Sequence, residues 1–209
     1  ANAGHWMDIG GSAPGGWAPQ AQEIHQEGII IPPLRLFEDG KRNESLVKMF
    51  LANVRLPDQI GGDIAAMTQV FHVGRRGLDD LVARYGAATV RECIDEMMLR
   101  SERQMRDHIE QIPDGTYHCT DYFDNDGIVD KPLTVKLALT VDGSEMHFDF
   151  TGTAPAAAGP LNMAETTTRS LSFVALKHLF PEVPVNGGTF RPTRFTVPQG
   201  CILAAQYPS

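Results

Sequence analysis

The chain has 209 residues and a formal net charge of −8, with 42% hydrophobic and 21% charged residues. This acidic balance argues against a nucleic-acid partner, because binding phosphates requires a basic surface. No apolar run approaches the ~20 residues that cross a bilayer, so we expect a soluble protein that acts on small molecules or on other proteins.

The first third of the chain begins with a loop. Gly and Pro dominate residues 1–22. Residues 28–37 are expected to be extended because Pro32 and Pro33 exclude a helix. A turn at residues 38–40 follows, and Asn43 or Ser45 can cap a helix that runs to about Arg55.

Two longer helices are predicted next. Gly61-Gly62-Asp63 indicates a break, after which Asp63 caps a helix that ends at Gly86. Gly74 and Gly77 weaken that helix, so close helix packing is expected there. A third helix covers about 88–111. The residues expected to face inward on these two helices are Ile64, Met67, Phe71, Leu78, Leu81, Tyr85, Val90, Ile94, Met97, Met98, Met105 and Ile109.

Residues 133–150 predict a β-hairpin. Apolar and polar residues alternate from Leu133 to Val141, which is the period of a strand. Asp142-Gly143 favours a type I′ turn. That turn pairs Leu139 with Met146, Leu137 with Phe148 and Val135 with Phe150, and it sets Lys136 against Asp149. Residues 117–123 are expected to add a third strand.

The last segment predicts a helix and a strand. Asn162 and Glu165 have capping-box spacing and open a helix to Phe180, with Met163, Leu171, Val174 and His178 on one side. Residues 190–197 form a final strand. The order of elements favours an α+β fold, an antiparallel hairpin or sheet with several packed helices, as part of a larger subunit. We expect a glycine-rich loop with a helical region over 1–112 and the hairpin region over 113–209.

Two residues of the first loop are candidates for chemistry. His5 and Asp8 lie three apart among glycines, so His5 could ligate a metal ion with Asp8 as second ligand or orienting group. The alternative is an Asx-turn with an incidental histidine.

Other polar groups are weaker candidates. Gln69, His72 and Arg76 share one helix face, which is more typical of a solvated surface than of a pocket. The aspartates of residues 121–130 do not fit a calcium loop, because Tyr122 and Leu133 take two of its ligand positions. A polar turn is expected there.

Several motifs are missing from the sequence. There is no GxxxxGK[ST] loop, no GxSxG elbow and no GxGxxG after a strand. The three cysteines, Cys93, Cys119 and Cys201, lie far apart, which favours reduced thiols and a cytoplasmic location. The chain starts at Ala1 without an initiator methionine and stops without a closing helix or strand, so we expect a piece of something larger.

A set of short motifs occurs in a characteristic order along nearly the whole chain. They are His5–Gly11, Glu27-Gly28 through Pro32-Pro33, Leu51–Arg55, Gly62-Asp63, Pro113–Tyr117, Asp149–Thr153, Gly159–Asn162, Pro184–Gly188 and Phe190–Pro192. Through this ordered set the sequence resembles the central portion of the hydantoinase B/oxoprolinase family, the B-type subunits of ATP-dependent hydantoinases, 5-oxoprolinases and related carboxylases.

The resemblance implies a division of labour. A separate A-type ATPase subunit (hydantoinase A-like) would phosphorylate the substrate, and the B-type subunit would hold a divalent metal, Mn, Zn or Fe, and complete hydrolysis of a cyclic amide. His5 matches the family's metal-ligand histidine, and Asp8 matches the adjoining loop, where we expect a catalytic, site-shaping role. The other ligands of the family lie upstream of this region.

Three functions remain open from the sequence. The leading one is part of a hetero-oligomeric, metal-dependent hydrolase of a hydantoin or 5-oxoproline, with doubtful activity as the isolated chain. The second is a subunit of the acetone or acetophenone carboxylase type. The third is a non-catalytic fragment that serves as an interaction module.

Overall fold

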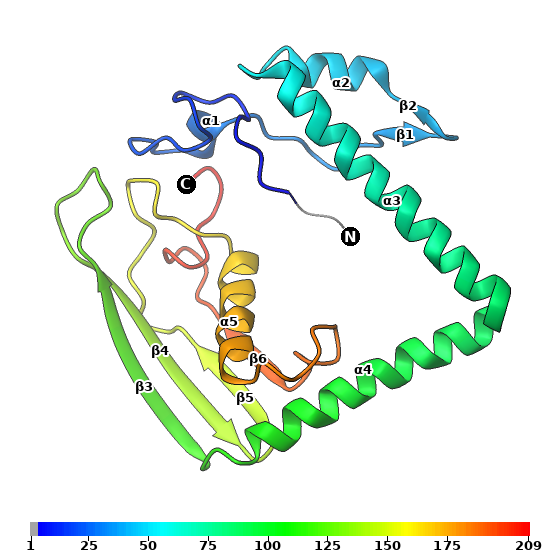
Figure 1. Cartoon of the computed structure of the whole chain (residues 1–209). Helices are drawn as coiled ribbons and strands as arrows, with labels where there is room; N and C mark the ends of the chain where they lie inside the picture. The colour runs from blue at the N-terminus through cyan, green and yellow to red at the C-terminus, as the bar shows by residue number, and fades with distance from the viewer. Residues whose placement is uncertain (1–3) are drawn as a thin grey trace. The chain divides into compact units, whose positions relative to one another are not determined.

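The structure is a computed structural model that describes residues 4–209 (Figure 1). The predicted loop over residues 1–22 lies inside this range except for its first three residues. The described residues form two β-sheets and five helices, α1 (Ile24–Glu27), α2 (Glu44–Leu51), α3 (Pro57–Tyr85), α4 (Ala87–Ile109) and α5 (Glu165–Leu179). This confirms the α+β class. None of these helices has the length and apolar character needed to cross a bilayer.

The chain divides into two compact units, one ending at Arg84 and the other running from Tyr85 to Tyr207. The division at residue 112 expected from the sequence stays a prediction. Each unit has its own hydrophobic core.

The core of the first unit joins the first loop to two helices. Phe50 from α2 and Ile60 and Ile64 from α3 are buried, and Trp6 packs against them with its ring centroid 5.2 Å from that of Phe50. Helix α2 begins where the sequence predicts, because the Asn43 side chain accepts a hydrogen bond from the backbone N–H of Leu46 at 3.1 Å. Before α2, the strands β1 (Phe37–Glu38) and β2 (Lys41–Arg42) pair across the predicted turn.

The predicted break at Gly61-Gly62-Asp63 is wrong, since α3 runs through these residues from Pro57. Proline suits the first helical position, where its missing N–H group has no intrahelical partner to lose. Ile60 and Ile64 are both buried, and burial of each contributes roughly 1.5–3 kcal/mol, so together they outweigh the cost of about 2 kcal/mol for the two glycines.

The predicted inward faces of the two long helices hold only in part. Ile64 is buried, and Met105 and Ile109 of α4 are buried in the core of the second unit. Other residues of the predicted faces are exposed, among them Phe71, Leu78, Leu81, Ile94 and Met97. For these positions the prediction of burial is wrong within residues 4–209.

The second unit is built on a four-stranded sheet in the order β3-β4-β5-β6. Its strands are β3 (Gly115–Phe123), β4 (Leu133–Asp142), β5 (Glu145–Asp149) and β6 (Thr193–Thr196). The first three are antiparallel, and β6 joins β5 in parallel after the crossover through α5, which lies over the sheet (Figure 1). The sheet is therefore mixed. Strand β3 is an edge strand of this sheet, and all nine of its residues are exposed.

The hairpin forms as predicted, but its register differs. Leu139 pairs with Phe148 and Val141 with Met146, so the turn residues are Gly143 and Ser144. Gly143 has φ +55° and is the only central residue with positive φ, which suits a type II′ turn rather than type I′. The shift moves each partner by two residues, so the apolar residues keep their face.

Helix α5 differs from the prediction in its start and its orientation. Its N-cap is Ala164, and the Asn162 side chain instead bonds the backbone of Ala157, accepting from its N–H at 2.8 Å and donating to its carbonyl at 2.9 Å. Leu171 and Val174 are exposed, while Leu176 is buried. Apolar residues occupy more than one side of this helix, and packing against the sheet selects the side with Leu176.

A buried carboxylate ties two loops of the second unit together. Asp126 Oδ1 accepts from the N–H groups of Ile128 and Val129 at 2.9 and 2.6 Å. Its Oδ2 accepts from Ala158 and Gly159 at 2.9 and 3.1 Å. These four donors, Val129 first, hold the pKa of Asp126 below its ordinary value although burial raises it. The carboxylate thus closes a polar turn, as predicted.

Candidate functional site

The first loop depends on glycine at two positions. Gly10 and Gly11 have φ +85° and +82°, a region that costs other residues about 1–2 kcal/mol. A Cβ atom at Gly10 would lie 2.7 Å from the carbonyl oxygen of Asn53, and one at Gly11 would lie 2.5 Å from that of Glu27. The loop therefore lies against two other backbone segments, the end of α1 and the segment before α3.

Asp8 fastens this loop to the start of α3. Its side chain is buried, with Oδ1 accepting from the Gly10 N–H at 3.1 Å and Oδ2 from the N–H groups of Leu56, at 2.9 Å, and Arg55. Burial raises the pKa of Asp8, but these N–H donors and the Arg55 guanidinium outweigh it and leave that pKa below its ordinary value. Asp8 is therefore an ionised acceptor whose two oxygens are both in use.

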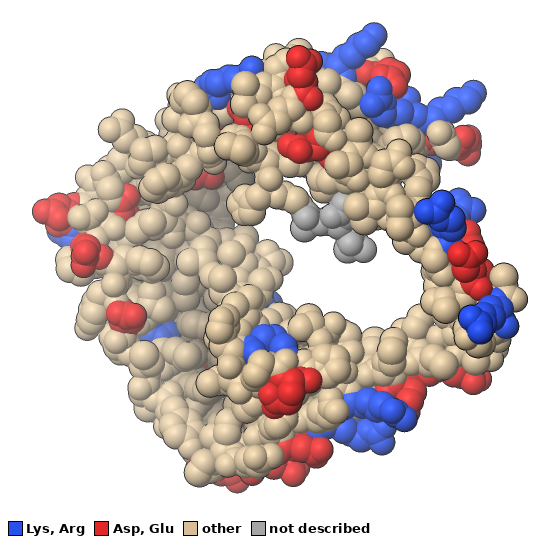
Figure 2. Space-filling model, in the orientation of Figure 1, with Lys and Arg blue, Asp and Glu red and all other residues tan. Residues whose placement is uncertain are grey.

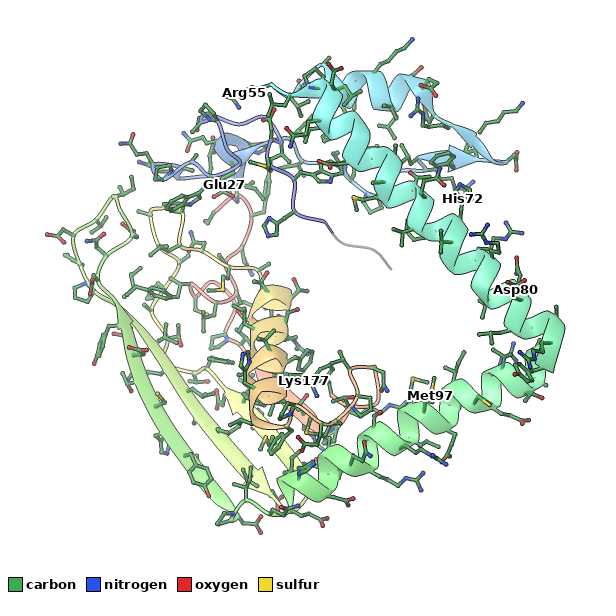
Figure 3. All side chains as sticks on the ribbon, viewed as in Figure 1. Glu27, Arg55, His72, Asp80, Met97 and Lys177 are labelled. Carbon is green, nitrogen blue, oxygen red and sulfur yellow. The ribbon has the colours of Figure 1, made fainter. Side chains whose placement is uncertain are left out.

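Arg55, labelled in Figure 3, contributes further contacts to the same loop. Its Nη1 lies 3.6 Å from Asp8 Oδ1 and donates to the carbonyls of Gly10 and Ala13 at 3.0 and 3.4 Å. Its Nη2 donates to the carbonyl of Gly11 at 2.8 Å. One guanidinium thus holds three parts of the loop, because its donors have a fixed planar geometry, whereas a Lys ammonium is a compact charge on a flexible stem.

His5 lies three residues before Asp8 in the same loop and is exposed. Within residues 4–209 no hydrogen bond or ion pair engages its ring, so both ring nitrogens are available. The structure thus brings His5 and Asp8 into one loop and gives them different environments. His5 is open to a ligand, and Asp8 is occupied by the protein's own donors.

The described part of the chain contains no group of three or more His, Cys, Asp or Glu that could hold a metal ion. His5 fits one position of a coordination sphere, because a neutral imidazole nitrogen is a common metal ligand. Asp8 does not fit a second position without giving up its backbone donors. The donors present between residues 4 and 209 therefore do not complete a site by themselves.

A small apolar pocket of about 150 Å³ lies next to the loop, with Trp6 in its wall. Its other lining residues are Ile31, Pro32, Leu34, Leu36, Leu46, Val47, Met49, Phe50 and Ile64. None of these can titrate, so the pocket supplies apolar contact and no acid–base group. The Trp6 indole Nε1 is buried and has no acceptor among the described residues.

The remaining candidates do not join this loop. Gln69, His72 and Arg76 are exposed on α3, as expected of a solvated face. Cys93 and Cys119 are exposed, Cys201 is buried, and all three are free thiols. Sequence reasoning did not single out Arg55. Its place at the end of the Leu51–Arg55 motif was the available signal, but its acceptors are carbonyls 42 to 45 residues away.

Similarity to known proteins extends over the whole chain. Subunit beta of the caprolactamase of Pseudomonas jessenii is 32% identical over 209 residues, and the crystal structure of this ATP-dependent enzyme superposes with a TM-score of 0.89 over 99% of the chain. The acetophenone carboxylase delta subunit of Aromatoleum aromaticum is 30% identical over 89% of the chain. The 5-oxoprolinase of Dictyostelium discoideum is 29% identical over 100% of the chain.

The chain is much shorter than these relatives, of which it spans 36%, 28% and 17% respectively. Two of the three are named as subunits. The sequence model of the hydantoinase B/oxoprolinase family matches residues 1–209. The chain therefore belongs to the hydantoinase B/oxoprolinase family.

Proposed function

We propose that this chain is part of a B-type subunit that takes part in the ATP-dependent hydrolysis of a cyclic amide such as a hydantoin or 5-oxoproline. The observation that carries this proposal is the likeness to the ATP-dependent caprolactamase, at 32% identity and a TM-score of 0.89 over 99% of the chain. The proposal concerns a whole subunit, because the chain spans 36% of that relative.

ATP is assigned to a partner, an A-type ATPase subunit. The sequence contains no phosphate-binding loop of its own. An amide is a poor electrophile, and transfer of a phosphoryl group to its oxygen makes that oxygen a far better leaving group. Relatives named as subunits support a hetero-oligomeric arrangement of this kind.

His5 is proposed as one ligand of a divalent metal, Mn, Zn or Fe, whose further ligands come from outside the described residues. When bound, such an ion polarises a substrate oxygen or activates a water molecule. Asp8, marked as a catalytic candidate by the sequence, is supported in a different role by its contacts. It holds the loop against Arg55 and Leu56, so it would position His5 rather than exchange a proton.

A carboxylase is the second candidate. The acetophenone carboxylase delta subunit is nearly as similar as the caprolactamase subunit, at 30% identity over 189 residues, but it matches 89% of the chain rather than 99%. The two functions differ in the role of the substrate carbon, since water attacks the activated amide carbon in hydrolysis, whereas the enol carbon of the ketone attacks the carboxylating group in carboxylation. No residue of the described loop distinguishes them.

The test uses the full-length subunit that contains this chain, purified with its ATPase partner. ATP-dependent ring opening of hydantoin, 5-oxoproline and caprolactam is measured beside ATP- and bicarbonate-dependent carboxylation of acetophenone. We expect ring opening, and carboxylation alone would favour the second candidate.

Metal content, measured by inductively coupled plasma mass spectrometry, tests the role of His5. We expect His5→Ala to lose the bound metal and His118→Ala, which removes another exposed imidazole, to retain it. Metal content unchanged by His5→Ala, or full turnover after chelation, would contradict the assignment.

A further inference from the structure

His5 lies between two residues that contact the body of the first unit. Trp6, which follows it, packs into the core of this unit, with its ring centroid 5.2 Å from that of Phe50. A Cβ atom at Gly4, which precedes it, would lie 3.3 Å from Met67 Sδ of α3. The backbone on both sides of His5 therefore lies against the unit, while His5 itself is exposed.

The first loop folds back over the backbone that follows His5. A Cβ atom at Gly16 would lie 3.5 Å from the carbonyl oxygens of both Trp6 and Met7. The part of the loop that leads to Gly16 is the part that Arg55 holds, since its guanidinium donates to three loop carbonyls at 2.8 to 3.4 Å. Arg55 thus reaches the backbone next to His5 through the loop.

Arg55 directs its guanidinium mainly at backbone carbonyls. Its Nη2 donates to the Gly11 carbonyl at 2.8 Å, whereas its Nη1 lies 3.6 Å from Asp8 Oδ1. The Arg55 side chain is 42% exposed, and an ion pair exposed to this degree usually contributes little to stability. What the contacts supply is order in a glycine-rich loop, whose backbone could otherwise take many conformations.

We propose that Arg55 is a positioning residue for the metal site. By fixing the loop that lies against Trp6 and Met7, its guanidinium keeps the backbone of His5 ordered before the ion binds, so that ordering does not have to accompany binding. Removing a group that orients a metal ligand typically weakens metal affinity about 10- to 100-fold. This inference rests on the proposed role of His5 as a ligand.

The charge of Arg55 predicts the opposite effect on metal affinity. Arg55 is paired with Asp8, so Arg55→Ala leaves a carboxylate in the loop without this counter-charge. By Coulomb attraction alone, that change would favour the binding of a divalent cation. On the face of the first unit that Figure 2 shows, basic and acidic side chains are interleaved, so the electrostatic change comes from Arg55 itself. The sign of the change in metal affinity therefore separates positioning from charge.

The experiment titrates Co²⁺ into the metal-free, full-length subunit, purified with its ATPase partner and without nucleotide. Co²⁺ is the probe because its visible absorption reports both binding and coordination. We expect Arg55→Ala and Arg55→Lys to bind Co²⁺ about 10-fold more weakly than the parent. Arg42→Lys is the matched control and should bind like the parent. Arg42 is 40% exposed in the same unit and holds Glu44 through two bonds at 2.7 and 2.9 Å.

Two further readouts separate positioning from a loss of folding, which circular dichroism monitors under the same conditions. At saturating Co²⁺ the absorption bands of Arg55→Lys should differ from those of the parent, whereas a role in stability alone would leave the bands of the folded variant unchanged. Millimolar guanidinium should restore part of the Co²⁺ affinity of Arg55→Ala, because it can donate to the same carbonyls, and should leave His5→Ala unchanged.

Two kinds of result would overturn the inference. If Arg55→Ala binds Co²⁺ as tightly as the parent or more tightly, while His5→Ala loses it, Arg55 does not position His5 and the proposed metal role stands. If the parent binds no Co²⁺, or His5→Ala binds it equally well, the proposed role of His5 fails and this inference fails with it.

Discussion

Replacing Gly11 by alanine isolates the effect of close backbone approach in the first loop, because Gly15 offers a matched control. Both residues have left-handed backbone angles, with φ +82° and +92°. A Cβ atom at Gly11 would lie 2.5 Å from the Glu27 carbonyl oxygen, whereas one at Gly15 would meet nothing within 4 Å. The two substitutions therefore share the conformational cost and differ in the clash.

The magnitude follows from the contacts that the clash disrupts. The backbone conformation alone costs alanine about 1–2 kcal/mol, which is the full effect expected for Gly15→Ala. In Gly11→Ala the loop must also move away, which breaks the bonds from the Ser12 N–H and hydroxyl to the Gln26 carbonyl at 2.7 and 3.0 Å. At about 0.5–1.5 kcal/mol for each bond, Gly11→Ala should cost about 2–5 kcal/mol in total.

Urea unfolding followed by tryptophan fluorescence measures this difference. The two tryptophans of the sequence, Trp6 and Trp17, both belong to the first unit, so the signal reports the unit that contains the loop. The free energy of unfolding of Gly11→Ala should lie at least about 1 kcal/mol below that of Gly15→Ala. Equal values for the two variants would show that the loop does not lie tightly against residues 26 and 27.

Two other predictions concern the second unit and the long helix. The pKa of Asp126 is lowered in the folded state, so its contribution to stability is present above the ordinary aspartate pKa near 4 and is lost as the pH falls below it. Urea titrations should show that Asp126→Asn is destabilised at neutral pH and loses less stability than the parent chain on acidification. Parallel stability–pH profiles for the two proteins would refute this. Gly77→Ala should stabilise the chain by about 1 kcal/mol in thermal melts, because Gly77 is helical and faces open space. Gly86→Ala should destabilise the chain, because Gly86 has φ +82°. A change in stability of the same sign for both variants would contradict the reasoning.

Local patterns predicted the elements whose signals lie within a few residues. The Asn43 cap and the alternation along β4 act over short distances, and both appear in the structure. The hairpin register was wrong because two turns are compatible with the sequence Asp142-Gly143-Ser144, and both keep the same residues on the apolar face. Two registers that differ by two residues give the same alternation of apolar and polar residues, so this alternation cannot distinguish them.

Features set by distant residues could not be predicted. Helix α3 starts at Pro57 after a segment that Asp8 holds through the N–H groups of Arg55 and Leu56, 47 and 48 residues away in the sequence. In the sequence alone the glycines that follow predict a break, because the anchoring residue lies far away along the chain. In the candidate site, the spacing of His5 and Asp8 identifies the loop but not the partners of the Asp8 carboxylate. A carboxylate that binds a metal ion and one that accepts from backbone N–H groups look alike in a sequence.

The exposed edge strand β3 has a consequence for the behaviour of the chain in solution. Its nine residues carry one carboxylate, Asp121, and no Lys or Arg, and they include Tyr117, Tyr122 and Phe123, which are 45%, 61% and 38% exposed. Natural edge strands avoid aggregation with lysine, proline or bulges, and β3 has none of the first two. Recruitment of foreign strands along this edge, rather than loss of the folded core, should therefore limit how far the protein can be concentrated.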